Sequence, residues 1–330
     1  MMCVNIPQSL SQLGLLLGYL AAVSVGGYTL GRASEILLGR LQARVIGGVL
    51  LGFAVTLPEY LFALISTLSR HNDVALGSAF GGNIFLFTLL YGVLFLANKS
   101  ASTAYRGLMF DVAVLGSSTL LIFFASIINT LNIYVGLALI LLYALFIAYS
   151  ARGSDDLRRE NPVDSLSTRS KFESLGFLAV GLILTVGFIH PLVNQVVLFS
   201  STVGIPPLIT SFTLVPAGDE LPELVAMFTL LKSASKRNTD TQGSQAAYAN
   251  LIGSKVQSNT LLIGTILIAA SIVGNPIVVS DKYTWFTLYA MVVTTFTGMF
   301  ATFSTTRRSV GVLLIVVYFI IMGVSVGLGI

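Results

Sequence analysis

The feature that most constrains this chain is a series of apolar segments, each about 20 residues long, that recurs from one end of the sequence to the other. A helix of that length crosses roughly 30 Å of hydrocarbon. Lipid offers no hydrogen bonds to the backbone, so each segment must form its hydrogen bonds internally, as a helix does. Only 10% of the residues are charged, against about a quarter in a soluble domain. The sequence therefore predicts an all-α, polytopic membrane protein.

Ten segments are long and apolar enough to be predicted as transmembrane helices. They lie at residues 10–30, 43–67, 74–98, 107–128, 131–151, 174–200, 204–231, 244–272, 282–304 and 309–329. The longest polar stretch separates the fifth segment from the sixth, which divides the chain into five spans and five spans. The predicted units are a first repeat at 1–151, a cytoplasmic linker at 152–173 and a second repeat at 174–330.

The basic residues predict the orientation of the chain in the membrane. Of the 18 Lys and Arg residues, fifteen fall in one set of loops, the opposite set holds only Arg70 and Lys282, and Lys255 lies inside a span. Because Lys and Arg near span ends stay in the cytoplasm, we expect both termini to be extracytoplasmic, with the plasma membrane as the location.

The same distribution limits the partners and cofactors of the chain. Its net charge of +4 is explained by the cytoplasmic loops and requires no nucleic acid. Cys3 is the only cysteine, which excludes an internal disulfide and a thiolate metal site. The expected partners are the lipid bilayer and inorganic cations, no cofactor is expected, and the oligomeric state is left open.

Two short motifs occur once in each half. Leu-Pro-Glu stands at 57–59 in the first half and again at 221–223 in the second. Gly-Gly-Asn-Ile at 81–84 is matched by Gly-Ser-Lys-Val at 253–256. These motifs lie in two predicted helix pairs, 43–98 and 204–272. Because five spans separate the copies, the second half enters the membrane from the opposite side, and we predict two inverted five-helix repeats.

Four acidic residues lie inside the motif spans. Glu59 belongs to the second span, and Asp219, Glu220 and Glu223 belong to the seventh. A carboxylate at the centre of a membrane costs about 2.5 kcal/mol or more, so it persists where it meets water, an ion or a partner. The spacing of three and four residues predicts that the three acids of the seventh span share one helix face.

Pro58 and Pro222 each precede one of these glutamates. Proline removes a backbone donor and displaces the carbonyl one turn earlier, so we expect both residues to break their helices and to free carbonyl oxygens near Val55 and Gly218. Ca²⁺ takes six to eight oxygen ligands. Glu59 and Glu223 are therefore the predicted metal ligands. The alternative is that the prolines only kink two packed helices.

The eighth span adds a polar stripe and a basic residue. Asn250, Ser254 and Ser258 are spaced four apart, so they share one face, and Lys255 and Asn259 form a second pair. Such a stripe either faces the acids or joins helices by hydrogen bonds. An ammonium at this depth needs a counter-charge, for which the acids of the seventh span are the candidates. The Lys255 ammonium therefore either competes with a bound cation or carries a transported proton, or it forms a permanent salt bridge.

These motifs resemble those of the sodium/calcium exchanger family, in the cation/Ca²⁺ antiporter superfamily, whose repeats read approximately G-T-S-L-P-E and G-S-N-I-F-N. The resemblance implies that Glu59 and Glu223 match paired Ca²⁺-binding glutamates and that Thr56 and Ser254 match hydroxyl ligands. The chain is a divergent member, because Asp219 and Glu220 replace hydroxyl residues. Lys255 replaces an Asn, and Leu86 and Ser258 stand where Asn or Asp is usual.

The predicted cation-binding residues are Thr56, Glu59, Asp219, Glu220, Glu223, Ser254 and Ser258, supported by Val55, Asn83, Gly218, Lys255 and Asn259. We expect a secondary antiporter, not an enzyme, that exchanges Ca²⁺ or another divalent cation for Na⁺ or H⁺ by alternating access. One alternative is a channel or a transport-inactive relative in which Lys255 fills the cation site. Another is an intramembrane aspartyl hydrolase that pairs Asp219 with Asp111.

Overall fold

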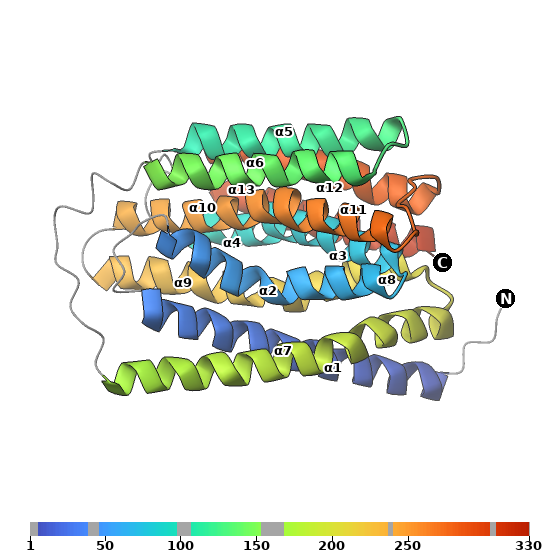
Figure 1. The fold of residues 1–330 in the computed structure, drawn as a ribbon, viewed down its shortest axis with the longest axis horizontal. Coiled ribbons are helices and arrows are strands. Elements are labelled where there is room, and N and C mark those ends of the chain that lie inside the picture. Colours follow the sequence, from blue (N-terminus) through green and yellow to red (C-terminus); the bar gives the residue numbers. More distant parts are fainter. Residues whose placement is uncertain are drawn as a thin grey trace.

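The computed structural model describes residues 6–38, 46–97, 107–152, 168–236, 240–303 and 308–329, and all regular structure in these ranges is helical (Figure 1). The first half contains α1 (Ile6–Leu38), α2 (Ile46–Leu68), α3 (Asn72–Phe85), the π-helical turn η1 (Leu86–Leu90), α4 (Tyr91–Ala97), α5 (Leu108–Ile127) and α6 (Ile133–Arg152). The second half contains α7 (Thr168–Val203), α8 (Pro207–Asp219), α9 (Leu221–Lys236), α10 (Asp240–Gln257), the π-helical turn η3 (Ser258–Leu262), α11 (Ile263–Ile272), α12 (Lys282–Phe303) and α13 (Arg308–Gly329).

Within the described residues these elements form ten spans, because α3, η1 and α4 are continuous, as are α10, η3 and α11, and α8 leads directly into α9. Eight of these helices are long and apolar enough to cross a membrane. The other two spans, α2 and α8 with α9, carry the Leu-Pro-Glu motifs. The start of α1 and the end of α13 lie at the same end of the bundle (Figure 1). The prediction of an all-α fold with ten spans in two inverted repeats is confirmed.

Several helices extend beyond the apolar segments that predicted them. α1 continues to Leu38 rather than residue 30, and α7 begins at Thr168 rather than residue 174. The predicted linker at 152–173 thus includes helical residues at both ends, Arg152 of α6 and 168–173 of α7. Hydropathy marks only the part of a helix that lies in lipid, and polar residues at the water interface continue the same helix.

A π-helical turn interrupts the same point of both repeats. η1 spans Leu86–Leu90 and η3 spans Ser258–Leu262, and the two turns have the same offset in sequence as the glycine motifs at 81–84 and 253–256. In each turn a threonine hydroxyl, that of Thr88 or Thr260, donates to the carbonyl four residues earlier. Single π-helical turns are frequent at functional sites. The repeat seen in the sequence is thus a repeat of backbone geometry.

The last helix of each motif pair packs closely against a neighbouring helix. A Cβ atom added to Gly92 of α4 would lie 2.7 Å from the carbonyl oxygen of Gly311 in α13. One added to Gly264, the equivalent residue of α11, would lie 2.9 Å from the carbonyl oxygen of Gly136 in α6. Both contacts require glycine, because a side chain would separate the two backbones. Since α13 and α6 each belong to the opposite half, the two repeats interlock through a symmetric pair of contacts.

The long helices α1 and α7 cross each other along one side of the bundle (Figure 1). Their close approach depends on small residues, since a Cβ on Gly181 of α7 would lie 2.9 Å from the carbonyl oxygen of Gly26 in α1. Ser174 of α7 also donates to the carbonyl of Ala33 at 3.0 Å. This pair contributes Gly27 to the centre of the molecule, as described below.

Candidate functional site

The acids of the seventh span lie at a break between two helices. α8 ends at Asp219, α9 begins at Leu221, and Glu220 occupies the junction with φ −91° and ψ 0°. Pro216 and Pro222 flank the junction; neither has a backbone N–H to donate, and their rings crowd the preceding turn. The predicted break is found in this half. It separates Asp219 from the two glutamates, so the three acids do not share a single continuous helix face as predicted.

The predicted break at Pro58 is wrong. α2 continues as a helix from Ile46 to Leu68 with Pro58 inside it. One proline removes one hydrogen bond, and the bonds on either side of it are enough to keep the helix intact. The second half differs because a further proline, Pro216, precedes Pro222 in the same span. The predicted supporting residue Val55 belongs to α2, but its side chain lies outside the described part of the structure.

The two Leu-Pro-Glu motifs meet at Gly27 of α1. A Cβ atom on Gly27 would lie 2.9 Å from Cγ of Pro58 and 3.0 Å from Cγ of Pro222. Both prolines therefore contact the same backbone position, although they belong to different halves of the chain. The glutamates that follow them are buried, Glu59 with 3% of its surface exposed and Glu223 with 1%.

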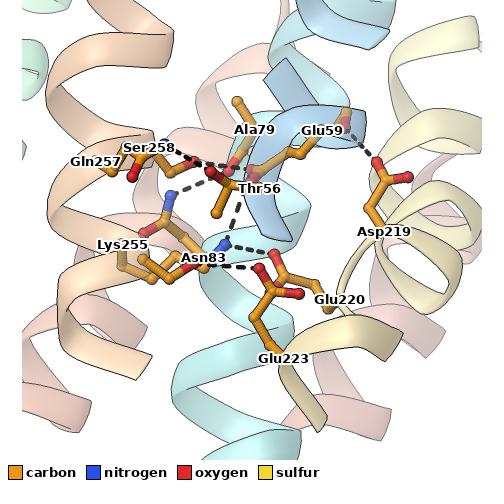
Figure 2. Close-up of polar contacts among 12 residues, drawn as sticks. Thr56, Glu59, Ala79, Asn83, Asp219, Glu220, Glu223, Lys255, Gln257 and Ser258 are labelled. Atoms are coloured by element: carbon orange, nitrogen blue, oxygen red, sulfur yellow. Dashed lines mark hydrogen bonds and ion pairs between the residues drawn. The ribbon is translucent and has the colours of Figure 1, made fainter. Parts of the chain in front are cut away.

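The predicted serine stripe faces the two glutamates. The Ser258 hydroxyl donates to Glu59 Oε1 at 2.8 Å, and the Ser254 hydroxyl donates to Glu223 Oε1 at 3.3 Å. These serines lie four residues apart, which is about 6 Å along a helix. One helix face of the second half thus positions a carboxylate from each repeat (Figure 2).

Lys255 lies between the acids and has no exposed surface. Its ammonium donates to Glu220 Oε1, and it lies 3.8 Å from Glu59 Oε1. The expected counter-charge from the seventh span is thus Glu220. Gly82 of α3 is close to all three groups: a Cβ there would lie 2.7 Å from Glu220 Oε1, 3.2 Å from Glu59 Oε1 and 3.3 Å from Lys255 Nζ.

Asp219 lies apart from Glu220 and Glu223 (Figure 2). It accepts a hydrogen bond from Ser78 of α3 at 3.4 Å, and its other oxygen, Oδ1, is buried without a hydrogen-bond partner among the described residues. Oε2 of Glu220 and Oε2 of Glu223 are also buried without a hydrogen-bond partner among the described residues. Three carboxylate oxygens are thus buried and available to a ligand. A buried oxygen that lacks a donor is costly unless a cation or a proton meets it.

The remaining predicted residues join helices near the acids. Gln257 donates to the hydroxyl of Thr56 at 2.6 Å. The Asn83 amide donates to Asn259 Oδ1 at 2.7 Å, and the Asn259 amide donates to Thr119 at 3.0 Å. The first two bonds connect the two motif helix pairs, and the third connects the second pair to α5.

The backbone carbonyl of Gly218, predicted to be free, accepts a hydrogen bond from Ser24 of α1 at 2.9 Å. This carbonyl also accepts a backbone N–H at the end of α8, so the proline-rich turn does not leave it free.

Three residues of the site were not predicted: Ser78, Gly82 and Gln257. Gly82 pairs with Ser254 inside the glycine motifs, and Ser78 pairs with Asn250 when that alignment is extended towards the N-terminus, so the repeat would have identified both. Gln257 faces Phe85 in that alignment, and only its burial as an amide in an apolar span distinguishes it.

The hydrolase hypothesis receives no support from this geometry. Asp111 lies in the first turn of α5, at a helix end, whereas Asp219 lies at the central break and bonds Ser78.

Three solved structures, two of them ion exchangers by name, have the same fold as this chain. The H⁺/Ca²⁺ exchanger CAX superposes with a TM-score of 0.71 and 19% identity, over 97% of this chain and 86% of that one. YfkE gives 0.71 with 17% identity, over 94% and 91% of the two chains. The sodium-calcium exchanger NCX_Mj gives 0.60 with 20% identity, over 96% and 99%.

Similarity at the level of sequence families points the same way. No curated protein matches the sequence closely enough to serve as a relative. The family model described as sodium/calcium exchanger protein matches residues 11–152 and 173–327, which includes every predicted site residue. This integral, multi-pass membrane protein therefore belongs to the sodium/calcium exchanger family.

Proposed function

We propose that this chain is a secondary cation antiporter that exchanges Ca²⁺, or another divalent cation, for H⁺ or Na⁺. The observation that carries the proposal is the pairing of Glu59 and Glu223 from inverted repeats along one polar face of α10 and η3. Oxygen ligands from carboxylates and hydroxyls are the chemistry that Ca²⁺ requires. Family membership supports transport of cations in general.

Inverted repeats supply the mechanism. The site lies where the motif helices of the two halves meet, so rocking one set of helices against the other exposes it to alternate sides of the membrane. We propose that 1–151 and 174–330 are the two repeat units of this cycle. The basic loops favour a protein with both termini outside the cytoplasm, in the plasma membrane.

The acids favour H⁺ over Na⁺ as the coupled ion. Asp219 and Glu220 stand where the first repeat has Val55 and Thr56, and a carboxylate can take up a proton whereas a threonine hydroxyl cannot. Outside the ion pair of Glu220 with Lys255, the buried oxygens Asp219 Oδ1 and Glu223 Oε2 have no donor in the described structure and are positions where a proton can be held when the metal leaves.

The test is Ca²⁺ uptake into proteoliposomes that contain the purified protein, driven by an imposed H⁺ or Na⁺ gradient. Glu59→Gln and Glu223→Gln should each abolish gradient-driven uptake, because each removes a charged ligand without changing side-chain volume. Ser126→Ala is the matched control, since that hydroxyl donates to the carbonyl of Ile122 in its own helix, away from the acids. Uptake that survives both glutamine substitutions would remove the proposal.

A second candidate is a transport-inactive relative, favoured by one observation, the ion pair of Lys255 with Glu220 inside the site. In that case the ammonium fills the cation position permanently. The parent protein should then bind no Ca²⁺ by calorimetry, and Lys255→Asn should bind it.

A further inference from the structure

Lys255 and Glu220 form a pair that is separate from the hydroxyl contacts of the site. Among the described residues, the Glu220 side chain has Lys255 as its hydrogen-bond partner, while Glu59 and Glu223 receive serine hydroxyls. The bond from Lys255 to Glu220 is direct, whereas its distance to Glu59 is 3.8 Å. The ammonium is therefore assigned mainly to Glu220.

The pair exists in only one of the two repeats. At the equivalent positions of the first half, Thr56 stands for Glu220 and Asn83 stands for Lys255. At these two positions the second half thus adds one negative and one positive charge, and these two charges meet each other. Together they leave the net charge of the site unchanged.

The backbone leaves room for this pair at Gly82. The equivalent residue of the second half is Ser254, which carries a hydroxyl, but a Cβ on Gly82 would lie within 3.3 Å of Glu220 Oε1, Glu59 Oε1 and Lys255 Nζ. The charged pair therefore occupies the volume that a side chain of the first repeat would fill. An ammonium in that volume is a cation held by the chain itself.

We propose that Lys255 is a built-in counter-cation: it neutralises Glu220, occupies the position of one monovalent cation, and leaves Glu59 and Glu223 to bind one transported divalent cation. The inference rests on the proposed function for the identity of the transported ion. It differs from the transport-inactive alternative because the ammonium fills a neighbouring position rather than the divalent site. It also assigns ion selectivity to Lys255, since a filled position cannot accept Na⁺.

Three variants test the assignment: Glu220→Gln, Lys255→Met, and the double variant. Ca²⁺ affinity is measured by calorimetry, and the unfolding temperature is measured with Na⁺ or with choline at equal ionic strength. Glu220→Gln should weaken Ca²⁺ binding by at least about tenfold, because the ammonium then turns to Glu59. The double variant should recover most of that loss, since it contains neither the unpaired charge nor the competing ammonium.

Lys255→Met should gain a response to Na⁺. With the ammonium absent, Glu220 needs another cation, so Na⁺ should raise the unfolding temperature of Lys255→Met and leave that of the parent unchanged. Binding to the native state alone produces such a rise. The double variant should lose the Na⁺ response, because Glu220 is then neutral.

The outcomes separate this inference from the proposed function. If the parent and every variant fail to bind Ca²⁺, the proposed function is wrong, and a Na⁺ response confined to Lys255→Met would still support the counter-cation. If the parent binds Ca²⁺ but Lys255→Met shows no Na⁺ response, the inference is overturned. Should Glu220→Gln fail to fold, the charge-balanced double variant decides: loss of Ca²⁺ binding there would make Glu220 a ligand and overturn the inference. Ca²⁺ binding by Lys255→Met and not by the parent would also overturn it, because the ammonium would then block the divalent site.

Discussion

Adding one methyl group at Gly27 should show how closely the two Leu-Pro-Glu motifs approach each other. The Cβ of Gly27→Ala would lie 2.9 Å from Cγ of Pro58 and 3.0 Å from Cγ of Pro222. Carbon atoms in contact lie about 3.5–4.0 Å apart, so each contact is too short by at least roughly 0.5 Å. Neither proline ring can rotate away, because its atoms are tied to the backbone. The backbones of α1, α2 and α9 must therefore separate.

Overpacking of this kind costs about 1–3 kcal/mol. One kcal/mol shifts the unfolding temperature by roughly 2–4 °C in a domain of about 150–250 residues, and by less in a larger protein, so a loss of several degrees is expected. The assay is thermal unfolding of the purified protein in detergent. Gly18→Ala is the matched control on the same helix, because nothing lies within 4 Å of its added Cβ.

The control should be neutral or slightly stabilising, since alanine favours a helix over glycine. Equal unfolding temperatures for Gly27→Ala and Gly18→Ala would refute the reasoning, because the two prolines could not then both contact α1. Gly27→Ala should also slow Ca²⁺ uptake, since the separated helices carry Glu59 and Glu223.

Three further predictions concern the rest of the molecule. Gly264→Ala should lose about 1–3 kcal/mol by overpacking against α6, seen as a lower unfolding temperature, whereas Gly253→Ala in the same span, with open space around its added Cβ, should not. Asn259→Ala removes the hydrogen bonds of Asn259 with Asn83 and Thr119, each worth about 0.6 kcal/mol, so the unfolding temperature should fall. An unchanged unfolding temperature would contradict these two interhelical bonds. Burial raises the pKa of the Asp281 carboxyl, but hydrogen bonds from Thr284 and nearby backbone N–H groups outweigh it and lower the pKa below its ordinary 3.8. The Asp281 carboxylate caps the start of α12 by accepting these hydrogen bonds. Its stabilising effect is fully present above pH 3.8 and is lost as the pH falls through the lowered pKa. The unfolding temperature of the parent protein should therefore fall more steeply below about pH 4 than that of Asp281→Asn.

The motifs predicted which polar residues would gather but not how all of them pair. Charge alone identified a partner for Lys255, because an ammonium in lipid must find an acid. The bonds from Gln257 to Thr56 and from Ser78 to Asp219 join residues 201 and 141 positions apart. Periodicity shows which face of a helix is polar, but it does not show which other helix that face meets. The break at Pro222 and its absence at Pro58 also depended on a second proline, Pro216, that lies outside the repeated motif.

Glycines were the least predictable part of the site. Neither Gly27 nor Gly82 has a side chain that can bind an ion; Gly27 lies outside the repeated motifs, and Gly82 lies inside one of them. Their importance comes from what lies next to them: two proline rings in one case and three charged groups in the other. Only the three-dimensional arrangement distinguishes Gly27 from Gly14 or Gly18 of the same helix, which have open space around them.

The backbone of this protein is more symmetric than its chemistry. The π-helical turns and the contacts of Gly92 and Gly264 repeat in both halves, whereas the pair formed by Glu220 and Lys255 occurs in one. In an inverted-repeat transporter the inward and outward states exchange the conformations of the halves. Those states would have equal energy only if equivalent residues were the same. Because a buried ion pair is confined to the α8–α9 junction and α10, the two halves are not chemically equivalent, and the two states are not required to have equal energy.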